Sequence, residues 1–292
     1  MIIIRFILIF AGLLMIACGS DGGSADNDSN GRDESARVEG MHLRYAIQID
    51  NIPLIGPQSE QIDLFLASGA VHYAGKAEVT VVDEIKQIRR AAILKYSEDR
   101  QIILNPEDST YRIEFYDIKD QNEELEETAD ELPVPASKVN VTKTDQLEDI
   151  ADFGSCRKWT IRTSRSNKKD KDSIPILKGS IWIKEDLNGT EYLAEYYNSL
   201  RKYYRDTDFD GLELWRVLRK LDIPAAQLVE ILENIDGLIV KADLVCERFS
   251  LGRKAKITVS ANLSDMLEQR LIRELFEIPA GYEPAPGKES LP

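Results

Sequence analysis

Three aspartates stand two residues apart in the stretch DTDFDG. Asp206, Asp208 and Asp210 could present carboxylate oxygens to Ca²⁺, a hard cation that prefers such ligands. The spacing matches the opening of an EF-hand loop, but Val217 stands where the twelfth position needs a bidentate glutamate. The alternative is a polar turn in which Asp208 or Asp210 caps the helix that follows. Calcium is therefore the one cofactor for which the sequence offers ligands, and no other cofactor is expected.

Two of the three cysteines, Cys156 and Cys246, lie in the strand-like stretches GSCRKWTIR and KADLVCERF. An oxidising compartment permits a disulfide between them. The alternative is that both are small buried hydrophobic residues, because the geometry of a bridge does not follow from sequence. The chain has no Cys-x-x-Cys pair and no Cys/His cluster, so a zinc or redox site is not indicated.

The remaining cysteine, Cys18, closes an apolar block at residues 6–17. Arg5 is the only charge before it, and the block has the length of a secretory h-region. A membrane span needs about 20 apolar residues, so the block is short for one. The stretch MIAC resembles a bacterial lipobox, which predicts cleavage before Cys18 and acyl chains on its sulfur and its new amine. An ordinary signal peptide or a short anchor is the alternative.

Residues 19–40 read GSDGGSADNDSNGRDESARVEG, a Gly/Ser/Asp/Asn-rich composition that cannot bury enough apolar surface to fold. We expect a signal peptide at 1–17 and a lipidated, flexible tether at 18–40. More than one acyl chain gives stable anchoring. Gly19, instead of aspartate, follows the cysteine, which is typical of lipoproteins exported to the outer membrane. The expected location is the cell envelope, at the outer membrane facing the periplasm.

Catalysis is the class of function that the sequence supports least. His42 and His72 are the only histidines, and neither has a serine, cysteine or carboxylate pattern typical of a triad or metal site. The chain lacks GxSxG, a Gly-rich phosphate loop and HExxH. Its net charge of −14 also excludes attraction to nucleic acid. We expect a protein that is not an enzyme and has no nucleic-acid partner.

Alternating apolar residues dominate the rest of the chain and predict strands. The predicted strands are 41–50, 60–68, 70–83, 89–97, 100–104, 110–116, 139–144, 155–164, 176–184, 236–247, 252–262 and 266–273. Helical spacing predicts helices at 191–204, 212–221 and 225–235. The acidic stretch 117–138 reads as a solvated loop, with docking of a basic partner as the alternative.

This order of elements predicts an α+β fold with a large curved antiparallel sheet and helices packed on one face. We expect one domain over 41–283, with the acidic loop and a helical insert at 205–235, followed by a tail at 284–292. A sheet with one face covered by helices encloses an apolar space between the two layers.

Three stretches carry a resemblance to a known family. They are ILKYSEDRQIILNPEDSTYRIEFY, FGSCRKWTIR with GSIWIKEDLNGTEYLAEYY, and ELFEIPAGYEP. Their order resembles a family of bacterial periplasmic lipoproteins of unknown function, similar in layout to the outer-membrane lipoprotein carriers LolA and LolB. The resemblance covers roughly residues 41–117, 152–204 and 236–283. It implies an unclosed β-barrel with helices that line its mouth.

Two functions follow as hypotheses. The first is a lipid-anchored protein that binds an apolar ligand, such as an acyl chain, between sheet and helices. Its candidate lining residues are Leu43, Tyr45, Val79, Val81, Tyr192 and Tyr196. The second is a structural or interaction lipoprotein whose helical insert fills this space and whose acidic surface meets another envelope protein. A cavity of several hundred Å³ favours the first hypothesis and a fully packed interior favours the second.

The loop NIPLIGPQ, residues 51–58, holds three apolar residues between turn formers, namely Ile52, Leu54 and Ile55. In the LolB-like comparison, a protruding apolar loop touches lipid or cargo. The alternative is a loop that folds over the edge of the core, because most apolar loop residues pack against protein.

Overall fold

The computed structural model describes residues 36–53, 55–81, 84–116, 137–165, 175–186, 190–207, 209–250 and 253–286. All of them belong to one compact unit, Ala36–Pro292, which contains its own hydrophobic clusters. A unit with its own core has what a domain needs to fold alone. The predicted signal peptide, Cys18, most of the predicted tether and residues 117–136 of the predicted acidic loop lie outside the described residues.

The described strands form one twelve-stranded sheet in the order β12-β6-β5-β4-β3-β2-β1-β11-β10-β9-β8-β7. All neighbours pair antiparallel except β12 and β6, which pair parallel. The strands are β1 (Arg37–Asp50), β2 (Gln58–Ala67), β3 (Ala70–Val81), β4 (Glu84–Lys95), β5 (Arg100–Asn105), β6 (Thr110–Phe115), β7 (Ser137–Ile150), β8 (Gly154–Arg165), β9 (Ile176–Lys184), β10 (Leu238–Ser250), β11 (Arg253–Ile272) and β12 (Glu283–Pro284). The sheet is unclosed, with β12 and β7 at its two edges.

Strands β1 to β6 form a meander in which each strand pairs with the next. Strands β7 to β11 form the other side of the sheet, and the two sides meet where β1 pairs with β11. This central pairing runs from Arg37 opposite Ile272 to Asp50 opposite Thr258. The two strands predicted at 252–262 and 266–273 are therefore one strand of 20 residues.

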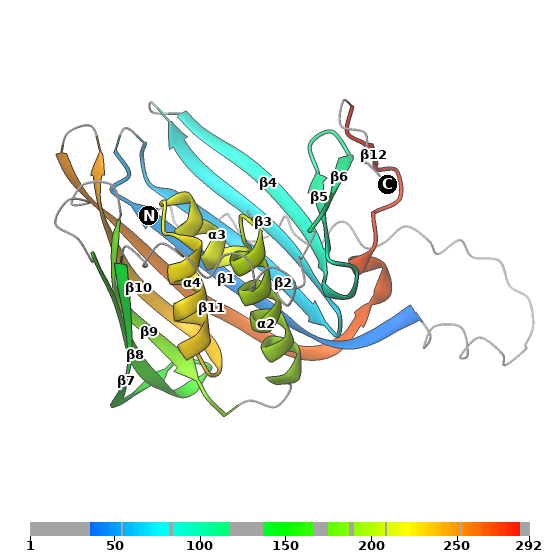
Figure 1. The fold of residues 1–292 in the computed structure, drawn as a ribbon. Helices are drawn as coiled ribbons and strands as arrows, with labels where there is room; N and C mark the ends of the chain where they lie inside the picture. The colour runs from blue at the N-terminus through cyan, green and yellow to red at the C-terminus, as the bar shows by residue number, and fades with distance from the viewer. Residues whose placement is uncertain are drawn as a thin grey trace, which may run out of the picture. The chain divides into compact units, whose positions relative to one another are not determined.

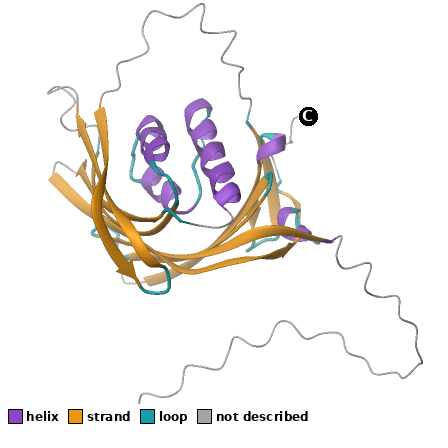
Figure 2. Ribbon diagram, turned by 90° about the horizontal axis from the view of Figure 1, so that it is seen from below, coloured by secondary structure: helices purple, strands orange, loops and turns teal. Residues whose placement is uncertain are grey.

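Three α-helices are found among the described residues, and all lie between β9 and β10 in the chain. They are α2 (Thr190–Asp206), α3 (Glu213–Lys220) and α4 (Ala225–Asn234). Two short 3-10 helices, η2 (Tyr96–Glu98) and η4 (Arg273–Phe276), follow strands. Figure 1 shows the three α-helices in front of the sheet, and Figure 2 shows them within its concave side. None of the described helices is long and apolar enough to cross a membrane.

Large side chains fill the space between the helices and the sheet. Tyr196, Tyr203, Phe209 and Trp215 are each less than 2 % exposed. They belong to the same hydrophobic cluster as Met41 and the other inward residues of β1. The predicted large, unclosed, mostly antiparallel sheet with helices on one face is confirmed, and its concave side is largely occupied by the protein itself.

Gly211 lies two residues before the first residue of α3 and has a φ of +85°, which residues other than glycine adopt at a cost of about 1–2 kcal/mol. A Cβ there would collide with the Tyr204 hydroxyl and lie 3.1 Å from the Arg216 backbone nitrogen. Gly281 has nearly the same φ, +86°, but open space around it. We expect Gly281→Ala to lower the free energy of unfolding by about 1–2 kcal/mol, and Gly211→Ala by about 1–3 kcal/mol more because of the collision.

Urea unfolding of the Ala36–Pro292 segment measures both losses. The Gly281→Ala variant is the matched control, because it carries the same backbone penalty without the collision. Equal losses for the two variants would contradict the tight packing of α3 against α2.

Candidate functional site

Three of the residues predicted to line a ligand site are enclosed in the core. Leu43 and Tyr196 are 0 % exposed and Tyr45 is 6 % exposed. The Tyr45 hydroxyl donates a hydrogen bond to the Ile239 carbonyl oxygen at 2.9 Å. These side chains contact other protein side chains in the main cluster.

The other three predicted lining residues lie at the margin of the core or beyond the described side chains. Tyr192 on α2 is half-buried and packs against the main cluster. Val79 on β3 is half-buried. The side chain of Val81 lies outside the described residues.

A pocket of about 340 Å³ opens at a different place, between α3 and the loop that joins β1 to β2. Seven of its lining residues are apolar and seven are polar or charged. They are Ile49, Ile52, Pro53, Ile55, Ala77, Val217 and Leu221, and Gln58, Ser59, Glu60, Arg90, Arg216, Lys220 and Arg248. None of the six predicted lining residues belongs to this described lining.

The loop 51–58 forms one wall of the pocket. The backbone amide of Gly56 donates to the Thr80 carbonyl at 3.0 Å, which ties the loop to β3. Ile52 packs against the core, whereas Ile55 is 38 % exposed. Leu54 lies outside the described residues. The loop thus lies along the edge of the core and presents apolar side chains to a pocket.

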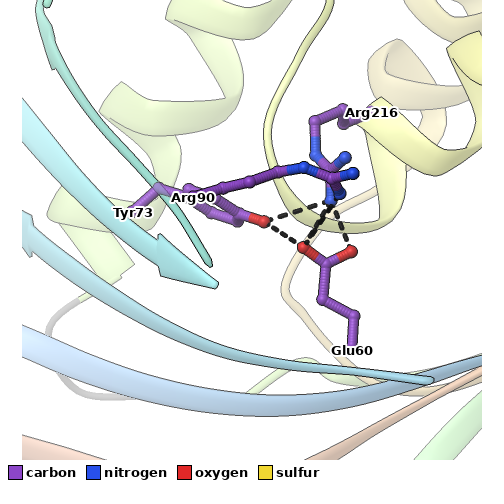
Figure 3. A network of polar contacts seen from close by, with 4 residues as sticks. All are labelled: Glu60, Tyr73, Arg90 and Arg216. Atoms are coloured by element: carbon purple, nitrogen blue, oxygen red, sulfur yellow. Dashed lines mark hydrogen bonds and ion pairs between the residues drawn. The ribbon is translucent and has the colours of Figure 1, made fainter. Parts of the chain in front are cut away.

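A buried ion pair forms the inner wall (Figure 3). Glu60 on β2 is 6 % exposed and Arg216 on α3 is 7 % exposed. An Nη atom of Arg216 donates to both carboxylate oxygens of Glu60, 2.5 Å from Oε1, and to the Tyr73 hydroxyl at 3.1 Å. The Tyr73 hydroxyl donates to Glu60 Oε1 at 2.5 Å, and Arg90 Nη1 lies 3.6 Å from the same oxygen. The pair therefore joins the helical layer to the sheet.

The position of Glu60 follows from the period of its strand. Glu60 shares the inward phase of Ile62 and Leu64, both of which are 0 % exposed. A carboxylate in this phase must be buried and therefore needs a partner. Burial raises the pKa of the Tyr73 hydroxyl, and the Glu60 carboxylate raises it further. Glu60 is absent from the predicted lining residues, although its inward phase in the strand is a sequence signal for this wall.

Cations outnumber anions in the described lining of the pocket. Four cationic residues, Arg90, Arg216, Lys220 and Arg248, face one carboxylate, that of Glu60. Partial desolvation lowers the pKa of the Lys220 ammonium, and Arg216 and Arg90 lower it further. The site is thus locally positive in a protein whose net charge is −14.

A second buried carboxylate begins α3 behind the pocket. Glu213 is 5 % exposed, and its burial raises its pKa to about 8. The Tyr196 hydroxyl donates to Glu213 Oε1 at 3.4 Å, and this hydrogen bond partly opposes the rise in pKa. Its Oε2 has no hydrogen-bond partner in the structure. Glu213 is therefore mostly protonated at neutral pH.

The two candidate disulfide cysteines are free thiols, and both are buried. Cys156 is on β8 and Cys246 on β10, with β9 between them. Cys246 pairs with Leu177 of β9, whereas Arg157, next to Cys156, pairs with Ile183. This register separates them by about 20 Å along the strands, far beyond the reach of a disulfide. The structure thus places the two as small buried side chains.

The candidate calcium ligands are only partly described. Asp206 is the last residue of α2, but its side chain and the whole of Asp208 lie outside the described residues. Asp210 is exposed. Within the described part of the chain, no group of three or more Asp, Glu, His or Cys residues is placed to hold a metal.

No protein-family model and no curated protein matches the chain. Among solved structures, the chain is similar to a porin-like protein from Bacteroides uniformis ATCC 8492, at 10 % identity and a TM-score of 0.23. The alignment covers 78 % of this chain and 96 % of that one. So weak a likeness assigns neither a fold nor a function.

Proposed function

We propose that this protein is a non-catalytic, lipid-anchored protein of the cell envelope that binds an apolar ligand, such as a lipid acyl chain, in the pocket beside α3. The observation that supports the proposal is the pocket itself, with its volume of about 340 Å³ and apolar side chains from β1, the loop 51–58 and α3. Small-molecule pockets span about 300–1,000 Å³.

Burial of an acyl chain against these side chains is favourable. Each CH₂ group removed from water contributes about 0.8 kcal/mol, so ten such groups contribute about 8 kcal/mol before the cost of ordering the ligand. Ile55 is 38 % exposed, so its side chain can exchange contact with water for contact with a ligand. The pocket therefore has the surface that a tight apolar contact needs.

The anchor belongs to the proposal as well. A lipidated Cys18 on a polar tether would hold the domain at the outer membrane, on its periplasmic side, within reach of lipid. The resemblance to LolA and LolB agrees with this proposal, because an unclosed antiparallel sheet with helices on its concave side is the layout that it implies.

The second candidate is a structural or interaction lipoprotein. Its support is the filled concave side, where the helices place Trp215, Tyr203 and other large side chains against the sheet. A carrier with a central cavity would leave this space open. An envelope protein would then be the partner, and the pocket beside α3 would have no ligand.

The test uses the Ala36–Pro292 segment and the neutral apolar dye phenylnaphthylamine, with dye fluorescence as the readout. We expect saturable uptake, and about tenfold weaker binding in Ile55→Ser because the variant loses apolar contact in the pocket. Ile85→Ser, at a 70 % exposed isoleucine outside the pocket lining, is the matched control and should bind like the unchanged protein. If the dye showed no saturable binding, the proposal would be refuted and the structural or interaction lipoprotein would be favoured.

A further inference from the structure

The charged residues that line the pocket indicate what the polar part of the ligand is. Arg216 is largely neutralised by Glu60, to which it is bound directly. Three cations then remain in the lining, namely Arg90, Lys220 and Arg248. A purely apolar ligand would leave these charges partly desolvated without a partner, which costs free energy.

Lys220 is the cation most available to a ligand. It makes no hydrogen bond or ion pair with any residue that the structure describes, and it lies on the same helix as Val217, which is part of the apolar lining. Lys220 is exposed at the mouth of the pocket lining, and its pKa is lowered by partial desolvation and then by the guanidinium groups of Arg216 and Arg90, with Glu60 and Asp210 opposing the shift only in part. An anion beside Lys220 would relieve that repulsion.

Arg248 and Arg90 form only weak ion pairs with carboxylates of the protein, so a ligand anion can compete for them. Arg248 Nη1 lies 3.1 Å from Asp222 Oδ2, but the Asp222 side chain is 66 % exposed, and such pairs contribute little. Arg90 reaches Glu60 only at 3.6 Å, beyond ordinary hydrogen-bond distance. Both arginines can therefore redirect toward a charged ligand.

Arg216 adds a buried donor to the same wall. Its Nε has no hydrogen-bond partner in the structure, although the residue is only 7 % exposed and lines the pocket. A buried donor without a hydrogen-bond partner destabilises the folded protein. A polar ligand atom in the pocket is one group that can satisfy it.

We infer that the ligand is an anionic amphiphile, with a carboxylate or phosphate headgroup held by Lys220, Arg248 and Arg90 and a single apolar tail along Ile52, Ile55 and Leu221. The inference rests on the proposed function and names the chemical class of its ligand. Carboxylate and phosphate share the chemistry that these cations recognise, because both accept charge-assisted hydrogen bonds from guanidinium and ammonium groups.

The experiment compares four competitors for the dye in the Ala36–Pro292 segment at low salt. They are dodecanoate, dodecyl phosphate, neutral dodecanol and inorganic phosphate, with the amphiphiles used below micelle formation. We expect one or both anionic amphiphiles to bind at least tenfold more tightly than dodecanol, and this advantage to shrink as salt is added. Preference between the two anionic headgroups identifies carboxylate or phosphate as the physiological chemistry.

The variants Lys220→Gln and Arg248→Gln should each weaken the anionic amphiphile about tenfold and change dodecanol binding less than twofold. Lys76→Gln is the matched control, because Lys76 is exposed and lies in the opposite phase of β3 from the lining residue Ala77. It should change neither affinity.

Equal binding of dodecanol and the anions, or unchanged anion affinity in Lys220→Gln and Arg248→Gln, would overturn this inference and leave the proposed function standing. The inference would also be overturned if inorganic phosphate displaced the dye as effectively as dodecyl phosphate does, because the apolar tail would then contribute nothing to affinity. Failure of every competitor and of the dye to bind would overturn the proposed function itself.

Discussion

Glu60→Leu is expected to lower the free energy of unfolding by about 3–5 kcal/mol, because it leaves the Arg216 guanidinium buried without its anion. Arg216→Met should cost a similar amount for the opposite reason, since it leaves the Glu60 carboxylate unpaired. The double variant, Glu60→Leu with Arg216→Met, removes both charges and should lose far less than the sum of the two single losses. Urea unfolding of the four proteins measures the coupling energy directly.

The surface pair Arg205–Glu233 supplies the control. Its side chains are 51 % and 47 % exposed, and the pair joins α2 to α4, as Glu60–Arg216 joins α3 to β2. The same double-variant cycle with glutamine at both positions should give a coupling below about 1 kcal/mol. A coupling at Glu60–Arg216 as small as this would show that the pair does not hold the helical layer to the sheet.

Glu213→Gln is expected to make the protein more stable at pH 8 by about 3–5 kcal/mol and to change stability little at pH 4.5. The pKa of Glu213 is about 8 in the folded protein, against an ordinary value of 4.5. Between these two pH values, Glu213 therefore holds a proton in the folded protein that it releases in the unfolded chain. Stability from this group is complete below pH 4.5 and falls by about 1.4 kcal/mol for each pH unit up to about pH 8. Glutamine removes the titration.

No cation among the described residues lowers the raised pKa of Glu213. The groups whose pKa its charge raises are all tyrosines, namely Tyr45, Tyr96, Tyr196, Tyr197 and Tyr204. Unfolding curves of wild type and Glu213→Gln across pH 4.5–8 provide the measurement. The difference between their free energies of unfolding removes the contributions of titrating groups that the two proteins share. A difference that stays flat across this pH range would refute the raised pKa of Glu213.

Local patterns predicted most of the elements, because burial of one face imposes its period on the sequence. The alternation in β1 and the turn residues between β4, β5 and β6 were sufficient to place these strands. β11 was predicted as two strands because Ser264 is an extra residue opposite the Arg44–Tyr45 step of β1. This bulge shifts the alternation by one position, so the period breaks while the strand continues.

The pocket was harder to predict than the fold, because its walls come from four distant parts of the chain. The loop 51–58, Arg90, α3 and Arg248 meet only through the order of strands in the sheet and the path of the helices. Tyr45 and Tyr196 are residue types suited to an apolar site, but neighbouring side chains fill the space around them. From the sequence, both the apolar loop 51–58 and the inward phase of Glu60 pointed to this pocket.

The pairing of β1 with β11 has a consequence for the kinetics of folding. The centre of the sheet joins residues 37–50 to residues 258–272, so it closes a loop of more than two hundred residues. Contacts between residues so far apart in the chain lose loop-closure entropy before the contacts stabilise the fold. Proteins dominated by such contacts therefore fold slowly. During synthesis, β1 would expose an unpaired edge until β11 has been made, and an unpaired edge promotes association with other chains. The first half of the sheet therefore depends on the last long strand for protection against aggregation.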